Sequence, residues 1–238
     1  MSGLHQKDIR NRLLAALPAD EFGLLSSSLE RVTWTLGDRI IEPNEPCDFA
    51  FFPEQGLMSQ IAITTEGRRL EVGIYGRDGM GPSNVVLGVD RSPCMHIVQG
   101  KGYAYRLPVS IMMDVMEKSI VLRPLLLRFV QVYMTQTNYT AVSNGSNIIG
   151  QRLARWILMT HDRLEMDDLS LTHEFLGVML GVRRSGVTEA IHVLEGSHVI
   201  KATRGNIRVI NRPMLEQIAG DSYGVPEAEY ERLIGTMR

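Results

Sequence analysis

The chain has 238 residues, of which 44% are hydrophobic and 22% are charged, and its net charge is −2. This balance is typical of one large globular domain or two modest ones and excludes a disordered chain. No apolar run is long enough to cross a bilayer, and the first residues lack the pattern of a secretory signal. We therefore expect a cytoplasmic protein with no membrane partner. Two cysteines, Cys47 and Cys94, exclude a disulfide framework, although a single bridge between them stays open.

The first half of the chain predicts a short helical entry followed by β-structure. Residues 4–17 predict one amphipathic helix, and Pro18 and Asp20 favour a second helical start. From about residue 30 to residue 108, short β-type runs alternate with glycines. These runs include residues 57–64, 70–75, 95–100 and 103–107. Because no helical crossovers separate the runs, they predict an antiparallel roll or barrel.

Residues 121–146 predict one long helix with an apolar stripe. The stripe consists of Leu122, Leu125, Leu126, Phe129, Val132, Tyr133 and Met134. Its repeat is near 3.5 residues, which favours pairing with the same helix of a second subunit in a two-fold homodimer. The alternative is a core helix within one subunit. The sequence Asn144-Gly145-Ser146 predicts a hinge. We thus expect a β-roll domain with an N-terminal helix over residues 1–120, a dimerisation helix and hinge over 121–146, and a second domain over 147–238.

Residues 170–195 predict two helices joined by a tight turn. Thr172 is a good N-cap, and Gly181 permits the left-handed conformation at the end of the first helix. The second helix spans about residues 183–195. Its outward face carries Arg184, Ser185, Thr188 and Glu189. Arginine can bind guanine through two hydrogen bonds, and serine and threonine can bind bases or phosphates, so these four residues are expected to face a DNA major groove.

A short basic hairpin is predicted directly after the second helix. Arg204-Gly205-Asn206 forms a turn between two short strands. Lys201 and Arg204 give this hairpin positive charge, and Arg183 precedes the second helix. We expect these three residues to lie near phosphates, as the wing of a winged helix-turn-helix does. The alternative is a small helical domain whose hairpin binds another protein.

The segment LTHEFLGVMLGVRRSGVTEAIHVLE resembles the helix-turn-helix of the Crp/Fnr family of bacterial transcription regulators. The resemblance implies an α+β fold, with an N-terminal antiparallel β-roll (a cupin-like jelly roll), a long dimerisation helix and a C-terminal winged helix-turn-helix. It also implies a homodimer that reads a palindromic site on double-stranded DNA under control of a signal at the roll. RNA polymerase would be a further partner of an activator. Ser185 and Glu189 stand where cAMP-responsive members usually have Glu and Arg, so we expect a different half-site.

Residues 76–93 resemble the phosphate-binding cassette of cyclic-nucleotide domains. Gly81 matches its central glycine, and Arg91 and Ser92 match its phosphate-binding pair, which makes these three the candidate effector residues. Pro82 stands where that cassette has its ribose-binding Glu, and this argues against cAMP. Another small effector, or none, remains open. The competing function is a cyclic-nucleotide-binding regulatory module that acts on a protein partner.

Other candidate sites are weak. Cys94 and His96 could share a strand face and bind a metal, but no further Cys/His cluster accompanies them. A packed histidine is therefore favoured, and we expect neither a metal site nor a certain cofactor. Because no catalytic motif is present, we expect a protein that is not an enzyme.

Overall fold

The computed structural model describes residues 4–237. The α-helices are α1 (Arg12–Ala15), α2 (Ala19–Ser26), α3 (Val109–Lys118), α4 (Leu122–Ser146), α5 (Ile149–Leu164), α6 (His173–Leu180), α7 (Arg184–Gly196), α8 (Arg212–Ala219) and α9 (Val225–Leu233). The strands are β1 (Glu30–Trp34), β2 (Arg39–Ile41), β3 (Phe49–Ile63), β4 (Arg69–Tyr75), β5 (Met95–Pro108), β6 (Asp168–Leu169), β7 (Ile200–Thr203) and β8 (Asn206–Val209). Short 3-10 helices are η1 (Gln6–Asp8), η2 (Ser83–Leu87) and η3 (Gly220–Ser222). No helix within the described residues is long and apolar enough to span a membrane.

The N-terminal half folds as the predicted antiparallel sheet. Its strand order is β1-β5-β3-β4, and β2 pairs with β5. β5 runs unbroken from Met95 to Pro108, so the runs 95–100 and 103–107 form one strand rather than two. Its pairing register with β3 shifts near Gly100, and this irregularity accommodates the glycines within one continuous strand. The α+β class predicted from the sequence is therefore confirmed.

The predicted single helix over residues 4–17 is wrong, because the chain there forms η1 and α1 as separate pieces. Asn11 lies between them, and its side-chain oxygen accepts hydrogen bonds from the amides of Leu13 and Leu14. The side-chain nitrogen Nδ2 of Asn11 donates to the carbonyls of Pro53 and Gly79, at 3.0 and 2.7 Å. These hydrogen bonds to the roll interrupt the helix at Asn11, although the apolar periodicity of the sequence continues through this position.

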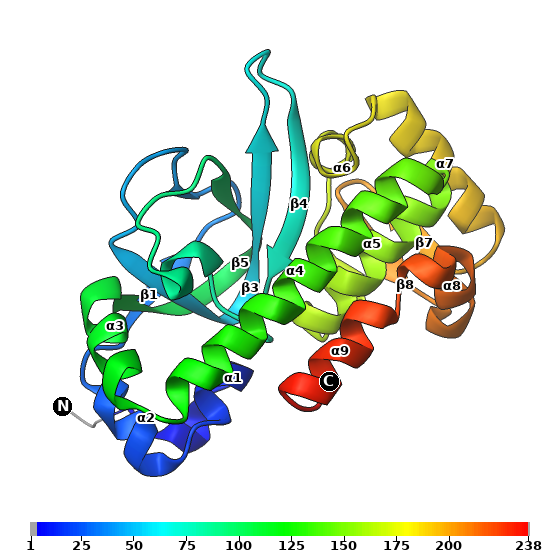
Figure 1. The fold of residues 1–238 in the computed structure, drawn as a ribbon. Coiled ribbons are helices and arrows are strands. Elements are labelled where there is room, and N and C mark those ends of the chain that lie inside the picture. The colour runs from blue at the N-terminus through cyan, green and yellow to red at the C-terminus, as the bar shows by residue number, and fades with distance from the viewer. Residues whose placement is uncertain (1–3, 238) are drawn as a thin grey trace.

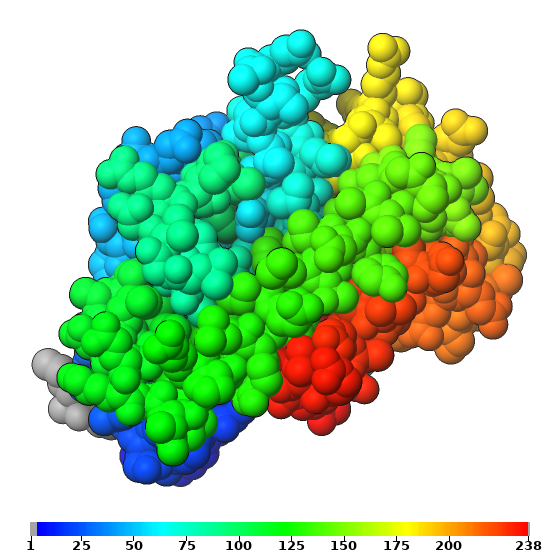
Figure 2. Space-filling model, viewed as in Figure 1, coloured from blue at the N-terminus to red at the C-terminus, as the bar shows by residue number. Residues whose placement is uncertain are grey.

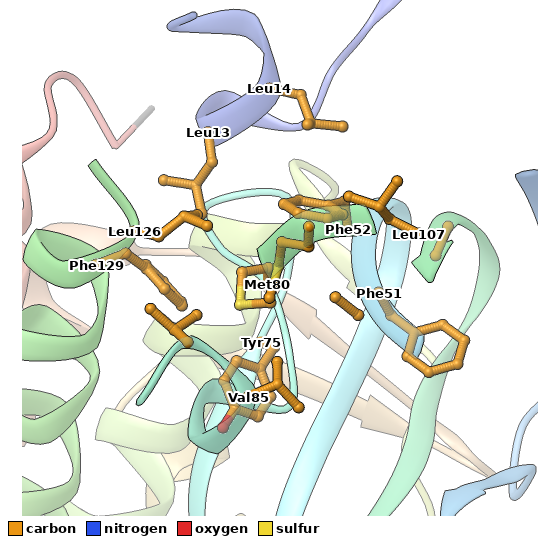
Figure 3. Close-up of a cluster of buried hydrophobic side chains, with 14 of the residues drawn as sticks. Leu13, Leu14, Phe51, Phe52, Tyr75, Met80, Val85, Leu107, Leu126 and Phe129 are labelled. Atoms are coloured by element: carbon orange, nitrogen blue, oxygen red, sulfur yellow. The ribbon is translucent and has the colours of Figure 1, made fainter. Parts of the chain in front are cut away.

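The main core joins the N-terminal helices, the sheet and α4. Leu13 and Leu14 come from α1, Phe52 from β3 and Leu126 from α4, and all are buried in one cluster. Figure 3 shows these side chains meeting around Met80 and Tyr75. The interior of the roll is therefore closed by α4 of the same chain.

The apolar stripe of α4 lies against its own subunit, so its predicted place in a dimer seam is wrong for these residues. Leu122, Leu125, Leu126, Phe129, Val132, Tyr133 and Gln136 are all buried. The Gln136 side chain also forms hydrogen bonds with the edge strand β4. Its Oε1 accepts from the Ile74 amide at 2.7 Å, and its Nε2 donates to the Ile74 carbonyl at 3.3 Å. Met134, which the stripe included, is 53% exposed on the opposite face.

The C-terminal half has its own core around α5 and a three-stranded sheet of order β6-β8-β7. α4 ends at Ser146, where the predicted helix over residues 121–146 also ends, and the break before α5 falls at Asn147–Ile148. Figure 1 shows α4 running diagonally between the roll and this half, with α9 returning alongside it. Tyr230 of α9 is buried in the core of the roll, which ties the end of the chain to its first half.

Candidate nucleic-acid interface

α6 begins and ends as its sequence predicts. The Thr172 hydroxyl accepts a hydrogen bond from the Phe175 amide at 3.2 Å, which caps the helix. Gly181 ends it with φ +61°, a left-handed conformation that glycine adopts without strain. A Cβ on Gly177 would lie 3.1 Å from the Val182 carbonyl oxygen, so a small residue there lets the turn fold close to α6.

α7 places its polar side outward. Val187, Ala190, Ile191 and Leu194 are buried against the domain core. Arg184, Ser185 and Glu189 are accessible on the opposite side, together with His192. A helix held by one apolar face and bearing arginine and serine at its free N-terminal end can enter a DNA groove. The predicted orientation of α7 agrees with the structure at these positions.

Thr188 is the position at which α7 contacts α6 through polar groups. Its hydroxyl donates to the Arg184 carbonyl at 3.1 Å and lies 3.1 Å from Nδ1 of His173. His173, the first residue of α6, thus links the two helices of the motif. Sequence reasoning missed this role, although the position of His173 directly after the N-cap could have drawn attention to it.

A hydrogen bond links the wing to α7. β7 and β8 pair in antiparallel register across Gly205, whose φ is +75°. The Glu195 carboxylate near the end of α7 accepts from the Ala202 amide at 2.8 Å. Lys201 and Arg204 are both exposed on the hairpin. His198 before the wing has φ +56°, a left-handed conformation that histidine tolerates better than most residues.

Four arginine and lysine side chains on this face are available to a ligand. Within residues 4–237, none of Arg183, Arg184, Lys201 and Arg204 forms an ion pair. Arg184 and Arg204 line a groove of about 530 Å³ between the start of α6, the start of α7 and the tip of the wing. Free arginines around a groove attract phosphate, since no existing ion pair has to be broken.

The candidate effector residues each have other contacts within the roll. The backbone of Gly81 pairs with Phe51 through two hydrogen bonds of 2.7 and 3.0 Å. The Arg91 guanidinium is on the surface, 3.4 Å from Asp90, with 59% of its side chain exposed. The Ser92 hydroxyl accepts from the Cys94 amide of its own loop at 3.1 Å. A cyclic phosphate would need the guanidinium and the hydroxyl to face one point, so the role predicted for these three residues remains a hypothesis.

The start of the cassette-like segment instead holds α5 against the roll. Arg163 of α5 forms a 2.7 Å ion pair with Asp78, and both side chains are almost fully buried. Arg77 contacts Glu165, which follows α5 and also pairs with Arg10 at 3.0 Å. Burial is the main cause of a lowered pKa of Arg77. This part of the roll is a structural junction with the C-terminal half.

A second contact between the halves is centred on Glu71 of β4. Its carboxylate accepts from the Trp156 indole at 2.6 Å and from the Ser59 hydroxyl at 2.5 Å. Burial raises the pKa of Glu71 to about 7, although both hydrogen bonds and the nearby Arg155 oppose the shift. No sequence pattern indicates this contact, because its partners lie far apart along the chain.

Cys94 and His96 form no candidate metal centre. His96 is fully buried and stacks on Tyr75 with ring centroids 5.8 Å apart. Burial lowers the pKa of His96 to about 3, so it packs as a neutral ring. Cys47 and Cys94 are both free thiols. Within the described part of the chain, no group of three or more metal-binding side chains occurs.

Comparison with known proteins supports the same fold and domain. Residues 151–218 match the family of Crp-like helix-turn-helix domains. A putative Crp/Fnr transcriptional regulator from Eubacterium rectale shares 17% identity, covering 88% of this chain and 98% of that one with a TM-score of 0.64. FixK2 from Bradyrhizobium japonicum shares 14% identity, covering 80% and 96% with a TM-score of 0.68. At such identities these likenesses show a shared fold. No curated protein matches this sequence.

The exposed cationic helix, the wing and the matched domain define a DNA-binding transcription regulator. The chain contains a Crp-like helix-turn-helix domain over residues 151–218, and its whole fold is similar to that of the Crp/Fnr regulators compared above. The predicted fold and the predicted resemblance of the helix-turn-helix segment are confirmed.

Proposed function

We propose that the protein acts as a homodimer that reads a palindromic DNA site. α7 would enter the major groove with Arg184, Ser185, Thr188 and Glu189, while Arg183, Lys201 and Arg204 would bind backbone phosphates. The observation that carries this proposal is the set of cations without ion pairs at the start of α7 and along the wing, within the described residues. Their arrangement around one groove fits a phosphate backbone beside a recognition helix.

Dimerisation would use the free face of α4 rather than its buried stripe. The residues Leu127, Gln131, Met134, Asn138 and Ala141 follow one another at alternating intervals of four and three on this face. This is the spacing of a coiled-coil seam, in which polar residues fix the register of two helices. A second copy of α4 would cover Leu127 and Met134 and place two recognition helices on one duplex.

Control would pass from the roll to the DNA-binding half through their shared contacts. A signal that repacks the pair of α4 helices would reset the spacing of the two α7 helices and so change the fraction of binding-competent dimers. RNA polymerase would be a partner if the protein activates transcription. Its place of action would be the cytoplasm, and we propose no catalytic activity. No observation favours a regulatory module that acts on a protein partner.

Selection of bound sequences from random double-stranded DNA tests the proposed function. We expect enrichment of palindromes whose half-sites are one DNA turn apart, roughly 34 Å. Non-palindromic single sites would contradict the dimer. Absence of any bound duplex at low ionic strength would overturn DNA recognition itself.

A further inference from the structure

The hairpin between β3 and β4 extends from the roll to the helix-turn-helix. Figure 1 shows its tip rising beside α6 and the start of α7. A groove of about 590 Å³ lies between them, with Gly67, Arg68 and Arg69 on the hairpin side. Figure 2 shows this hollow between the hairpin and the segment that carries α6. The sensor half therefore contributes one wall of a groove whose other wall belongs to the DNA-binding half.

Apolar contacts fix the hairpin in this place. A Cβ on Gly181 would lie 2.7 Å from Cδ1 of Leu70, so the Leu70 side chain covers the turn between α6 and α7. Further down the sheet, Ile61 and Met95 share one buried cluster with Met179 of α6. Because Leu70 directly follows Arg69, the contact at Gly181 also holds Arg69 beside the start of the recognition helix.

The groove is strongly cationic. Arg68, Arg69, Arg183 and Arg184 line it, against a single acid, Glu174. Arg68 is paired with Glu66 at 2.7 Å. Arg69 is exposed and, within residues 4–237, takes part in no ion pair. Arg184 also lines the adjoining groove that reaches Arg204, so the cations continue from the hairpin to the wing.

We propose that the β3–β4 hairpin is an additional DNA-contact element, in which Arg69 binds a backbone phosphate beside the half-site read by α7. This inference rests on the proposed function. A duplex seated on α7 continues past it in both directions, and its phosphates attract a free guanidinium on either side. DNA affinity then depends on the docked position of the roll, because a hairpin that leaves Gly181 removes one phosphate contact per subunit.

The test compares full-length Arg69→Ala with the wild-type protein on duplexes obtained by the selection described above. Arg39→Ala is the matched control, because Arg39 is an exposed arginine of β2 in the same roll and lines neither groove. Affinities are measured from about 0.05 to about 0.3 M salt. Each phosphate contact contributes about 0.9 to the slope of log affinity against log salt. Arg69→Ala should lower the slope by about 2 per dimer and the affinity at about 0.1 M salt by about tenfold or more.

The loss should be equal for all selected sequences, and hydroxyl-radical footprinting should show lost protection outside the half-site. Arg39→Ala should leave slope and footprint unchanged. If the wild-type protein binds DNA and Arg69→Ala has the same slope, the hairpin inference is wrong while the proposed function stands. A rise in affinity would mean that the hairpin obstructs DNA, which also overturns the inference. A wild-type protein that binds no duplex overturns both.

Discussion

Two segments of this chain look like binding motifs in the sequence, and the structure uses them in opposite ways. On the helix-turn-helix, Arg184 and Arg204 line an open groove and, within the described residues, form no ion pair. In the cassette-like segment from residue 76 to residue 93, Arg77 and Asp78 are buried in contacts with Glu165 and Arg163. Charge that is available for a ligand is thus a property of the fold, which a motif alone does not reveal.

Two glycines of the cassette-like segment serve packing between the roll and the long helices. A Cβ on Gly76 would lie 2.7 Å from the Arg163 side chain, and one on Gly79 would lie 2.2 Å from Phe129. These two glycines let α5 and α4 approach the roll, so the segment serves packing. We therefore expect changes on the DNA-facing side to alter binding, and changes at the junction to alter stability.

The largest expected effect on binding comes from the free face of α4. Leu127 is 40% exposed in one subunit, and Leu127→Glu would place two carboxylates in the proposed seam. A dimer gains about 10²–10⁴-fold in apparent affinity from linking two sites, and the variant should lose this gain on a palindrome. Sedimentation should find monomers, and thermal unfolding should remain cooperative.

Leu24→Glu is the control for that prediction, because Leu24 is an exposed leucine of α2, 53% accessible and outside the proposed seam. It should remain dimeric with unchanged DNA affinity. If the Leu127→Glu variant still forms dimers, the dimer interface does not lie on this face of α4.

At the junction, Glu71→Gln should change the pH dependence of stability. Burial raises the folded-state pKa of Glu71 to about 7 from a usual value of 4.5. The protonated Glu71 side chain makes its full contribution to the free energy of unfolding below about pH 4.5. This contribution is lost as the pH rises through 7, because the native protein must then hold a buried carboxylate. Each tenfold change in the protonation equilibrium corresponds to about 1.36 kcal/mol, so the loss is on the order of 3 kcal/mol.

Gln cannot ionise and can still accept from the Trp156 indole, so Glu71→Gln should remove this loss. Urea unfolding at about pH 5.5 and about pH 8.5 measures the free energy of unfolding. The variant should be more stable than wild type mainly at the higher pH. Glu66→Gln is the control, because the Glu66 side chain is 72% exposed at the hairpin tip. Equal gains for both variants, or no dependence on pH, would contradict the role given to Glu71.

On the recognition side, Arg184→Ala should change which sequence is bound. Loss of a two-bond contact to a guanine costs about 1–3 kcal/mol at one base position and relaxes the preference there. Arg204→Ala is the matched comparison, since a wing arginine on a phosphate should weaken all sequences alike and reduce the salt slope. Repeating the selection with both variants distinguishes the two roles. An unchanged base preference in Arg184→Ala would remove that residue from the major groove.

Local chemistry made the helix-turn-helix predictable. Thr172, Gly181 and Gly205 each fix a cap or turn through their own backbone preferences, and the buried face of α7 follows from its 3.6-residue period. The expected elements and accessible residues therefore agree with the structure there. The length of α4 was predictable for a similar reason, since no proline follows its first turn over its 25 residues.

Long-range contacts were not predictable from periodicity. The stripe of α4 suits a coiled coil and a roll surface equally, and only the position of the sheet decides that it packs inward. Asn11 breaks a periodic helix because its partners are the carbonyls of Pro53 and Gly79. Glu71 and Trp156 are 85 residues apart in sequence, and their hydrogen bond exists only once both halves have folded.

The smallest expected effect lies at Arg91, within the cassette-like segment. Its pair with Asp90 is exposed at 3.4 Å, and such pairs contribute about 0–1 kcal/mol. Arg91→Ala should therefore leave thermal unfolding and DNA affinity unchanged. Titration calorimetry with cAMP and cGMP should give no heat for wild type or variant, because Met58 and Tyr75 fill the space facing Gly81. Nucleotide binding that disappears in Arg91→Ala would instead restore the ligand role of this segment and show that the roll can open around Gly81.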